Sequence, residues 1–352
     1  MMNPNDRPLD LVAIGAANMD IIAKIDKFPE IDDQVAVTAL SYAPGGSAAN
    51  TVVSAAKLGL KVGFVGKVGR DHNGIELIKA FQDAGVDTDG IIVDADLPSG
   101  QVFIPVDQHA DRMIFAFPGA PQALKGEDII AKAPFLEKAL IVHLGSLRVT
   151  EPLIEAARLA SEHGSIVSMN PGGINAMRGY KALKDILDNV DVLVVSRREL
   201  DKMFGRADID SNANICFENT GVKLLVVTLG PKGSKYYYMG TSGEIEPIFD
   251  VPAVNTTGAG DAFYAGFIAN VLKQFKESLP SIKKPGMSYK ASFDEFLKAQ
   301  SATPSFFQQC LTFGNATAAF IVQGESARVN MPTWDMVVRF IWEHKRSDAG
   351  NQ

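Results

Sequence analysis

The chain has 352 residues, of which 46% are hydrophobic and 21% charged, and these ordinary values exclude a largely disordered protein. Because 41 Asp and Glu residues outnumber 34 Lys and Arg residues, the formal net charge is −7, and we expect no general attraction to nucleic acid or to an anionic membrane surface. The two cysteines, Cys216 and Cys310, are too few for a disulfide framework or a four-thiolate zinc site and suit a reducing cytoplasm, and no apolar run reaches the roughly 20 residues of a membrane span.

Most of the chain alternates short apolar strands with amphipathic helices. Residues 9–16 predict a buried strand that ends in a tight turn, and helices at 47–58 and 73–84 flank a strand at 61–68. From about residue 125 onward, strands at 140–144, 165–169, 191–195 and 222–229 alternate with helices at 151–163, 180–187 and 197–204. This rhythm predicts an α/β fold, with a doubly wound, mostly parallel sheet covered by helices on both faces.

Two parts of the chain do not follow this rhythm. Residues 33–42 alternate in polarity, and the runs 100–107 and 111–117 form a predicted hairpin. We expect a small antiparallel sheet that stands off the main body as a lid, formed by about 33–43 and 98–118 within one domain of residues 1–352. The segment at about 275–304 is rich in Lys, Ser and Pro, which predicts a surface insertion or mobile loop.

Residues 255–266 contain three small residues, Gly258, Ala259 and Gly260, that lead directly into a helical pattern. Such a turn exposes backbone N–H groups at a helix start, which can bind an anion without a basic side chain. Asp261 would repel a static phosphate there, but it could accept the proton of a hydroxyl that attacks the phosphorus. The alternative is an ordinary turn in which Asp261 caps the helix.

Two further stretches join strands to polar residues. Gly45 and Gly46 allow the backbone to approach a ligand closely, and Asn50, one helical turn later, offers a donor and an acceptor suited to a polyol. Asp20 lies just past the first strand, where ligands of open α/β sheets bind, and could accept hydrogen bonds from sugar hydroxyls. Residues 170–172 follow a later strand and could also bind substrate or phosphate.

The order Asn18-x-Asp20, Gly45-Gly46-x-x-x-Asn50 and Thr257-Gly258-Ala259-Gly260-Asp261 resembles the ribokinase-like, PfkB-type family of carbohydrate and nucleoside kinases. The resemblance extends from about Leu9 to Pro332 and includes Val68-Gly69-Arg70-Asp71-x-x-Gly74 and Phe117-Pro118-Gly119-Ala120. It implies a doubly wound α/β domain with a small β-sheet lid, in agreement with the pattern of strands and helices.

By this resemblance, Asp261 is the catalytic base, and the amides of Ala259, Gly260 and Asp261 form the hole for the transferring γ-phosphoryl group. The acceptor would be bound by Asn18, Asp20, Gly45, Gly46 and Asn50. ATP would be bound by Ser196, Glu199, Thr228, Gly230, Gly233 and Asn315, with Mg²⁺ oriented by Glu199 through water.

Three positions depart from the family pattern. Ser196 stands where the family usually has Asn in its Asn-x-x-Glu motif, so we expect altered metal–nucleotide geometry. Asn255 stands where Asp is common, which puts activation by a monovalent cation such as K⁺ in doubt. The stretch 143–146 lacks the Glu of true ribokinases, which argues against plain ribose as substrate.

We therefore expect a cytoplasmic, ATP- and Mg²⁺-dependent kinase that phosphorylates a primary hydroxyl of a sugar, and a homodimer that pairs its lids. A nucleoside kinase is the alternative, because five apolar residues could line a nucleobase slot or could equally be lid core: Val35, Val37, Phe103, Phe115 and Phe117. A non-catalytic sugar- or nucleotide-binding sensor is a third reading, which the presence of both Asp20 and Asp261 disfavours.

Overall fold

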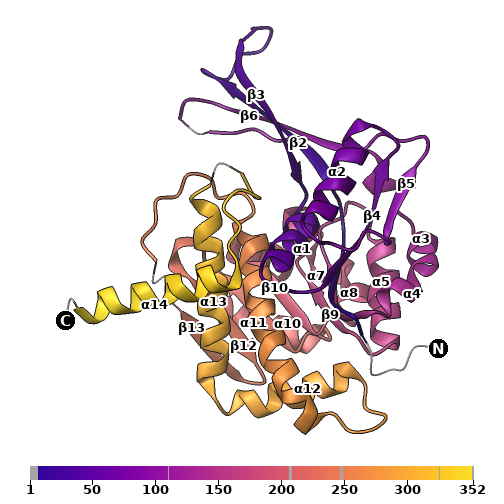
Figure 1. The fold of residues 1–352 in the computed structure, drawn as a ribbon, viewed down its shortest axis with the longest axis vertical. Helices are drawn as coiled ribbons and strands as arrows, with labels where there is room; N and C mark the ends of the chain where they lie inside the picture. Colours follow the sequence, from indigo (N-terminus) through magenta and orange to yellow (C-terminus); the bar gives the residue numbers. More distant parts are fainter. Residues whose placement is uncertain (1–6, 110, 206–207, 246–248, 325, 351–352) are drawn as a thin grey trace.

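The computed structural model describes residues 7–350, apart from 110, 206–207, 246–248 and 325. A nine-stranded sheet forms its centre, in the order β13-β12-β11-β10-β9-β8-β1-β4-β5 (Figure 1). Its strands are β1 (Leu9–Ile14), β4 (Val62–Gly69), β5 (Ile91–Asp94), β8 (Ala139–Leu144), β9 (Ile166–Met169), β10 (Val192–Ser196), β11 (Leu224–Thr228), β12 (Ser234–Tyr238) and β13 (Thr241–Ile245). All neighbours pair in parallel except β11 with β12 and β12 with β13, so the predicted mostly parallel sheet is confirmed.

Helices cover both faces because the central strands are apolar on both sides. In β1, Leu11 and Ala13 join one buried cluster, and Val12 and Ile14 join the other. The first face carries α1 (Ser47–Lys57), α2 (His72–Asp83), α11 (Ala259–Ile282), α12 (Tyr289–Ser301), α13 (Pro304–Val322) and the start of α14 (Trp334–Gly350). The second face carries α3 (Gly126–Ala131), α4 (Ala133–Leu136), α5 (Glu151–Glu162), α6 (Gly172–Ala176), α7 (Gly179–Ala182), α8 (Lys184–Leu187), α9 (Arg197–Phe204) and α10 (Ile209–Asn219).

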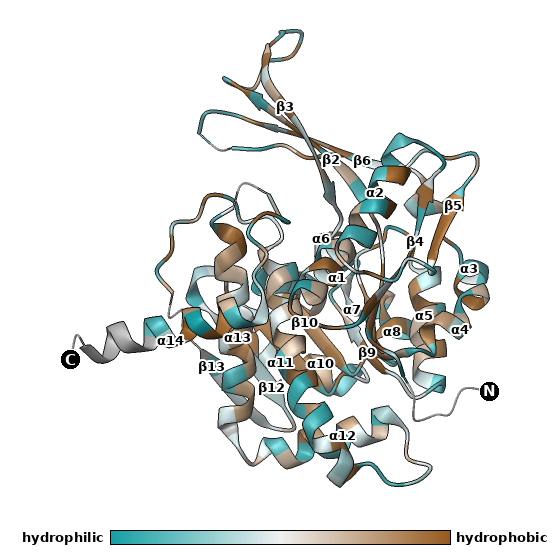
Figure 2. Ribbon diagram, in the orientation of Figure 1, coloured by the Kyte–Doolittle hydropathy of each residue, from teal (hydrophilic) through white to brown (hydrophobic). Residues whose placement is uncertain are grey.

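Hydropathy follows these layers: the central strands are mostly hydrophobic (brown), whereas the surrounding helices have both hydrophobic and hydrophilic (teal) residues (Figure 2). None of the helices in the described residues has the length and apolar character needed to cross a bilayer.

The strand order reverses direction at β1. From β1 the chain proceeds outward to β4 and β5, then returns to β8 on the other side of β1 and continues through β9, β10 and β11. In open α/β sheets, the crevice beyond the carboxyl ends of the strands at such a reversal binds the ligand. The fold therefore locates a candidate site beyond the ends of β1 and β8.

A second sheet of four strands projects from the body, in the order β3-β2-β6-β7 (Figure 1). It comprises β2 (Asn18–Ile25), β3 (Val37–Gly45), β6 (Gly100–Val106) and β7 (Phe115–Phe117), and we call it the lid. The expected lid segments are present, although the strand starts at 37 and not at 33. The strand β2 was not predicted, and it pairs in parallel with β6, so the expectation of a purely antiparallel sheet is wrong.

The base of the lid is tied to the body by Asp71 and Ser99. The Ser99 hydroxyl and amide donate to the two Asp71 carboxylate oxygens at 2.6 and 2.8 Å, and Gly69 N–H donates to Ser99 Oγ at 2.9 Å. Asp71 also caps α2 by accepting from Gly74 N–H at 2.8 Å. The Val68-to-Gly74 motif thus holds the chain where it enters β6.

The segment 275–304 is not an irregular surface loop. It contains the end of α11 and the whole of α12, whose Phe293 and Phe296 are buried against Phe275. The polar residues that suggested a loop lie on the outer side of a helix, while aromatic rings at i and i+3 face the core.

Replacement of Phe293 by Ala tests this packing. We expect the free energy of unfolding to fall by about 3–5 kcal/mol, because a fully buried ring leaves a cavity. Chemical denaturation measures the change. Lys298→Ala on the exposed side of α12 is the control and should change stability by less than about 0.5 kcal/mol; equal small effects of both substitutions would contradict the packing.

Candidate active site

The first turn of α1 begins beyond the carboxyl ends of β1 and β8. The helix can approach because Gly15 and Gly145 have no side chains: a Cβ at either position would lie 2.5 Å from the Ala48 Cβ. Gly46 precedes the helix with φ 101°, a conformation that favours glycine. This close approach brings Ser47 and Asn50 to the reversal point of the sheet.

The first turn of α11 meets that of α1. Gly258 adopts a left-handed conformation with φ 80°, and a Cβ there would lie 2.6 Å from the Ala327 Cβ. Ala259 starts the helix, and a Cβ on Gly260 would meet no atom within 4 Å, so the backbone at Gly260 borders open space. The predicted turn and helix start are therefore present, and their geometry suits a bound anion.

Asp261 lies where the two helix starts converge. Ser47 Oγ donates to its Oδ1 at 2.6 Å, and Asn50 Nδ2 donates to its Oδ2 at 3.1 Å. Burial raises the pKa of Asp261 to about 7, opposed by these two hydrogen bonds and by the charge of Arg328, while Glu199 adds to the rise. A carboxyl with a pKa near neutrality is suited to general-base chemistry.

A cavity of about 180 Å³ extends from Asp261 toward the later strands. Its lining brings together Asp261 and Gly260, Ser47, Ser196 and Glu199, Thr228, and Asn170 and Gly172 of the 170–172 stretch. Residues from five separate parts of the sequence thus surround one space. Five of the expected phosphate- and nucleotide-binding residues are among them, namely Ser196, Glu199, Thr228, Gly260 and Asp261.

Ser196 and Glu199 form a capping box at the start of α9. Ser196 N–H and Oγ donate to Glu199 Oε2 at 2.8 and 2.9 Å, and Glu199 N–H donates to Ser196 Oγ at 3.3 Å. Serine is a strong N-cap, so Ser196 preserves the helix start although the family that the sequence resembles usually has Asn there. It also fixes the Glu199 carboxylate against the wall of the cavity.

A second cavity of about 280 Å³ lies between the lid and the body. The lid contributes Asp20, Ile22, Ile104 and Arg112 among others, and the body contributes residues 253–257 with Ser326 and Ala327. Because Thr257 lines this cavity while Gly260 and Asp261 line the first, a single short segment borders both.

Asp20 follows the first strand as expected, and it lies on the lid strand β2, which was not predicted. A Cβ on Gly45 would collide with its carboxylate, and a Cβ on Gly100 would collide with the Asn18 side chain. The glycines therefore admit these two polar side chains between β2 and its neighbours β3 and β6. Burial raises the pKa of Asp20 to about 6, and Arg328 opposes the rise.

Two arginines that sequence reasoning did not single out contact the site. Arg328 donates through Nε to Asn50 Oδ1 at 3.0 Å, and Arg112 of the lid donates to Thr257 Oγ1 and, at 3.4 Å, to Asn255 Oδ1. Neither lies in a recognisable motif. The Asn50 side chain is hydrogen-bonded to both Asp261 and Arg328, so it contacts the candidate base directly.

Three of the residues expected to bind the nucleotide do not line either cavity. Gly230 and Gly233 have φ 62° and 91° in the turn after β11, where glycine is favoured. Asn315 is on α13, and its buried Nδ2 has no hydrogen-bond partner within the described part of the chain.

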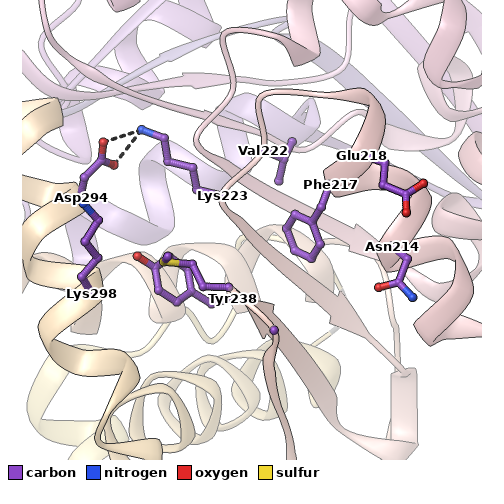
Figure 3. Close-up of a pocket in the computed structure, with 10 residues that line it drawn as sticks. Asn214, Phe217, Glu218, Val222, Lys223, Tyr238, Asp294 and Lys298 are labelled. Atoms are coloured by element: carbon purple, nitrogen blue, oxygen red, sulfur yellow. Dashed lines mark hydrogen bonds and ion pairs between the residues drawn. The ribbon is translucent and has the colours of Figure 1, made fainter.

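Another cavity, of about 540 Å³, lies at the opposite, N-terminal end of β11 (Figure 3). Its Lys223 is already paired with Asp294 at 2.6 Å and Asp191 at 3.0 Å. It contains none of the expected site residues. Among residues 7–350, outside the gaps already given, no three His, Cys, Asp or Glu side chains are grouped to hold a metal ion directly.

Asp261→Asn should stabilise the protein at alkaline pH. Because the folded-state pKa of Asp261 is raised, the folded chain binds an extra proton below about pH 7, and this stabilisation is lost as the pH rises. Asn cannot ionise, and Ser47 can accept from its amide. We expect the melting temperature of the variant relative to wild type to be a few degrees higher at pH 8 than at pH 5, as measured by calorimetry.

The control for this experiment is Glu76→Gln, which changes an exposed carboxylate on α2. It should show no such pH-dependent gain. A gain for Asp261→Asn that is the same at both pH values would contradict a raised pKa at this position.

Known proteins share both the sequence pattern and the fold. The family model described as "pfkB family carbohydrate kinase" matches residues 9–334. Fructokinase-1 of Zea mays is 31% identical over 69% of this chain and 77% of its own, and a nucleoside kinase of Methanothermobacter thermautotrophicus is 27% identical over 94% and 95%.

Solved structures agree with these relatives. A fructokinase from Xylella fastidiosa with bound ATP has a TM-score of 0.77 at 26% identity, covering 95% of this chain and 99% of that one. Ribokinase of Arabidopsis thaliana complexed with ribose and ATP has a TM-score of 0.73 at 25% identity, covering 95% and 98%. The chain therefore belongs to the pfkB family of carbohydrate kinases, phosphotransferases that act on hydroxyl groups of sugars or nucleosides.

Proposed function

We propose that this kinase transfers the γ-phosphoryl group of ATP to a primary hydroxyl of a sugar. The observation that carries the proposal is the position of Asp261 and its preceding turn. The turn borders the cavity that contains Ser196, Glu199 and Thr228, and it also borders the cavity that contains Asp20. A nucleotide on one side and an acceptor on the other would meet at this turn.

In the proposed reaction, Asp261 acts as the base. One carboxylate oxygen accepts the proton of the attacking hydroxyl as the oxygen forms its bond to phosphorus and the bond to ADP breaks. Ser47 and Asn50 hold the carboxylate in place, and a carboxylate retains lone pairs beyond these two hydrogen bonds.

The proposed anion hole contains two backbone amides and not the three expected from the sequence. Ala259 N–H donates to the Thr256 carbonyl at 3.3 Å, whereas the amides of Gly260 and Asp261 belong to a first helical turn that offers them no carbonyl acceptor. We propose that these two amides and the dipole of the 24-residue helix α11 stabilise the negative charge on the transferring group.

The residues near the first cavity fit a magnesium nucleotide. Glu199 and Thr228 line this cavity with a fixed carboxylate and a hydroxyl. Asn315 of α13, outside the lining, has a buried amide nitrogen without a hydrogen-bond partner in the described residues. We propose that they bind ATP together with Gly230 and Gly233, and that Glu199 orients Mg²⁺ through water. The metal, when bound, neutralises phosphate charge. Because the Arg112 guanidinium contacts Asn255, we include no monovalent cation.

The walls of the acceptor cavity favour a sugar over a nucleoside. None of the residues that line it is aromatic, and its apolar lid residues include Ile22, Ile104 and Val106. Phe103 and Phe115 lie on the other lid face, with ring centroids 6.4 Å apart, and stay exposed. Proteins commonly stack nucleobases on aromatic rings, whereas hydroxyls need polar groups such as Asp20.

Asp261→Asn tests the assignment of the base. We expect kcat for ATP-dependent phosphorylation across a panel of sugars to fall by about 10²–10⁴-fold, because the variant cannot accept the proton. ATP binding, measured by calorimetry, should change little. Wild-type turnover in this variant would exclude the mechanism, and Glu76→Gln should remain fully active.

We also propose that two chains pair through their lids. The lid ends in open strands, β3 and β7, and exposes Leu40, Tyr42, Phe115 and Phe117, each more than half exposed. Open edges with an apolar face favour pairing with another strand, and a second copy presents the same edges. The cytoplasmic location stays a prediction.

Phe115→Glu tests the lid pairing. A charge in the apolar face should convert the dimer to a monomer, so light scattering should give half the mass found for wild type. Val338→Glu, at an exposed site on α14, is the control and should leave the mass unchanged. A monomeric wild-type protein at micromolar concentration would refute the proposal.

A further inference from the structure

Arg328 interacts electrostatically with two carboxylates of the site, Asp20 and Asp261. It follows α13 in a turn, and its guanidinium stands 5.6 Å above the centre of the Phe81 ring. Its Nε donates to Asn50 Oδ1 at 3.0 Å, and its terminal nitrogen approaches the Gly45 carbonyl oxygen at 3.5 Å.

The hydrogen bond from Arg328 determines how the Asn50 amide is oriented. Because Nε is a donor only, the amide must turn its oxygen toward Arg328. Its nitrogen is then left to donate to Asp261 Oδ2, at 3.1 Å. Arg328 therefore donates to Asn50, and Asn50 donates to Asp261, in one connected pair of hydrogen bonds.

We propose that Arg328 is a positioning residue for phosphoryl transfer, which holds Asp261 through Asn50 and supplies one positive charge to both the base and Asp20. The inference rests on the proposed function, since it concerns the same site. Arg328 acts through Asn50 and through its charge.

The charges around the two carboxylates support this role. Ser47 and Asn50 of α1 are neutral, Glu199 of α9 raises the pKa of Asp261, and Arg328 is the cation that lowers it. Arg328 likewise opposes the rise of the Asp20 pKa. Loss of the guanidinium would favour the protonated carboxyl, which cannot serve as a base.

Kinetics of Arg328→Met test the proposal. We expect kcat to fall about 100-fold, as for a misplaced catalytic group, with a smaller change in the KM for ATP. The acidic limb of the pH profile of kcat/KM should move to higher pH by about one unit, because an opposite charge has been removed. A purely structural role would lower kcat without moving the limb, and that result would overturn the proposal.

A double-mutant cycle with Asn50→Ala tests whether Arg328 acts through Asn50. The double variant should be little worse than the poorer single variant, because both remove the same support. Fold-losses in kcat that multiply would mean independent action and would overturn the proposal.

A second substitution, Arg328→Lys, separates charge from geometry. Lysine keeps the charge but not the Nε hydrogen bond, so the limb should stay near its wild-type position while kcat still falls about tenfold. If Arg328→Met is too unstable to assay, the same cycle is measured with Arg328→Lys, and multiplying losses there would equally overturn the proposal.

Arg158→Met is the matched control. Arg158 is exposed on α5 and pairs with Glu155 and Glu162, so kcat and the limb should be unchanged. Wild-type protein is assayed first against the sugar panel. An inactive wild type would refute the proposed function itself, whereas active wild type with an unaltered Arg328→Met profile refutes only the role of Arg328.

Discussion

The convergence of two helix starts on one carboxylate is the constraint on which the site depends. The first turns of α1 and α11 come from positions 47 and 261, more than two hundred residues apart, and meet through the hydrogen bonds from Ser47 and Asn50 to Asp261. Both helices direct their positive ends toward this point, which favours the negative charge that burial disfavours. A pKa near 7 suits the proposed role, in which Asp261 accepts a proton at neutral pH and releases it afterwards.

In the proposed reaction, backbone groups would bind phosphate in a protein whose net charge is negative. Asp20, Asp261 and Glu199 surround the site, and Arg328 offsets only part of their charge. Backbone amides at a helix start attract an anion without adding a side chain that would compete with the base. Because they are fixed in the helix, they need no rearrangement as charge develops on the transferring group.

The lid borders the candidate site, because its two central strands, β2 and β6, both contribute residues to the second cavity. β2 starts at Asn18 and β6 at Gly100, and these residues are partners in the parallel register. The polar side chains of Asn18 and Asp20 fit there only because Gly100 and Gly45 lack a Cβ. The hydrogen bonds between Asp71 and Ser99 connect the base of β6 to the start of α2.

The sequence by itself determined the α/β class, the positions of most strands of the large sheet and the identity of Asp261 as the candidate base. Those features follow from local patterns: hydrophobic period, small residues before a helix, and a carboxylate in the first turn. Only the tertiary structure decided that Asn18 begins a lid strand, that Asn50 contacts Asp261, that Arg328 joins them and that Phe103 faces away from the acceptor. These depend on which distant segments pack together, as with β2 and β6 or Asn50 and Arg328, and a contact between distant segments leaves no periodic signal in either one.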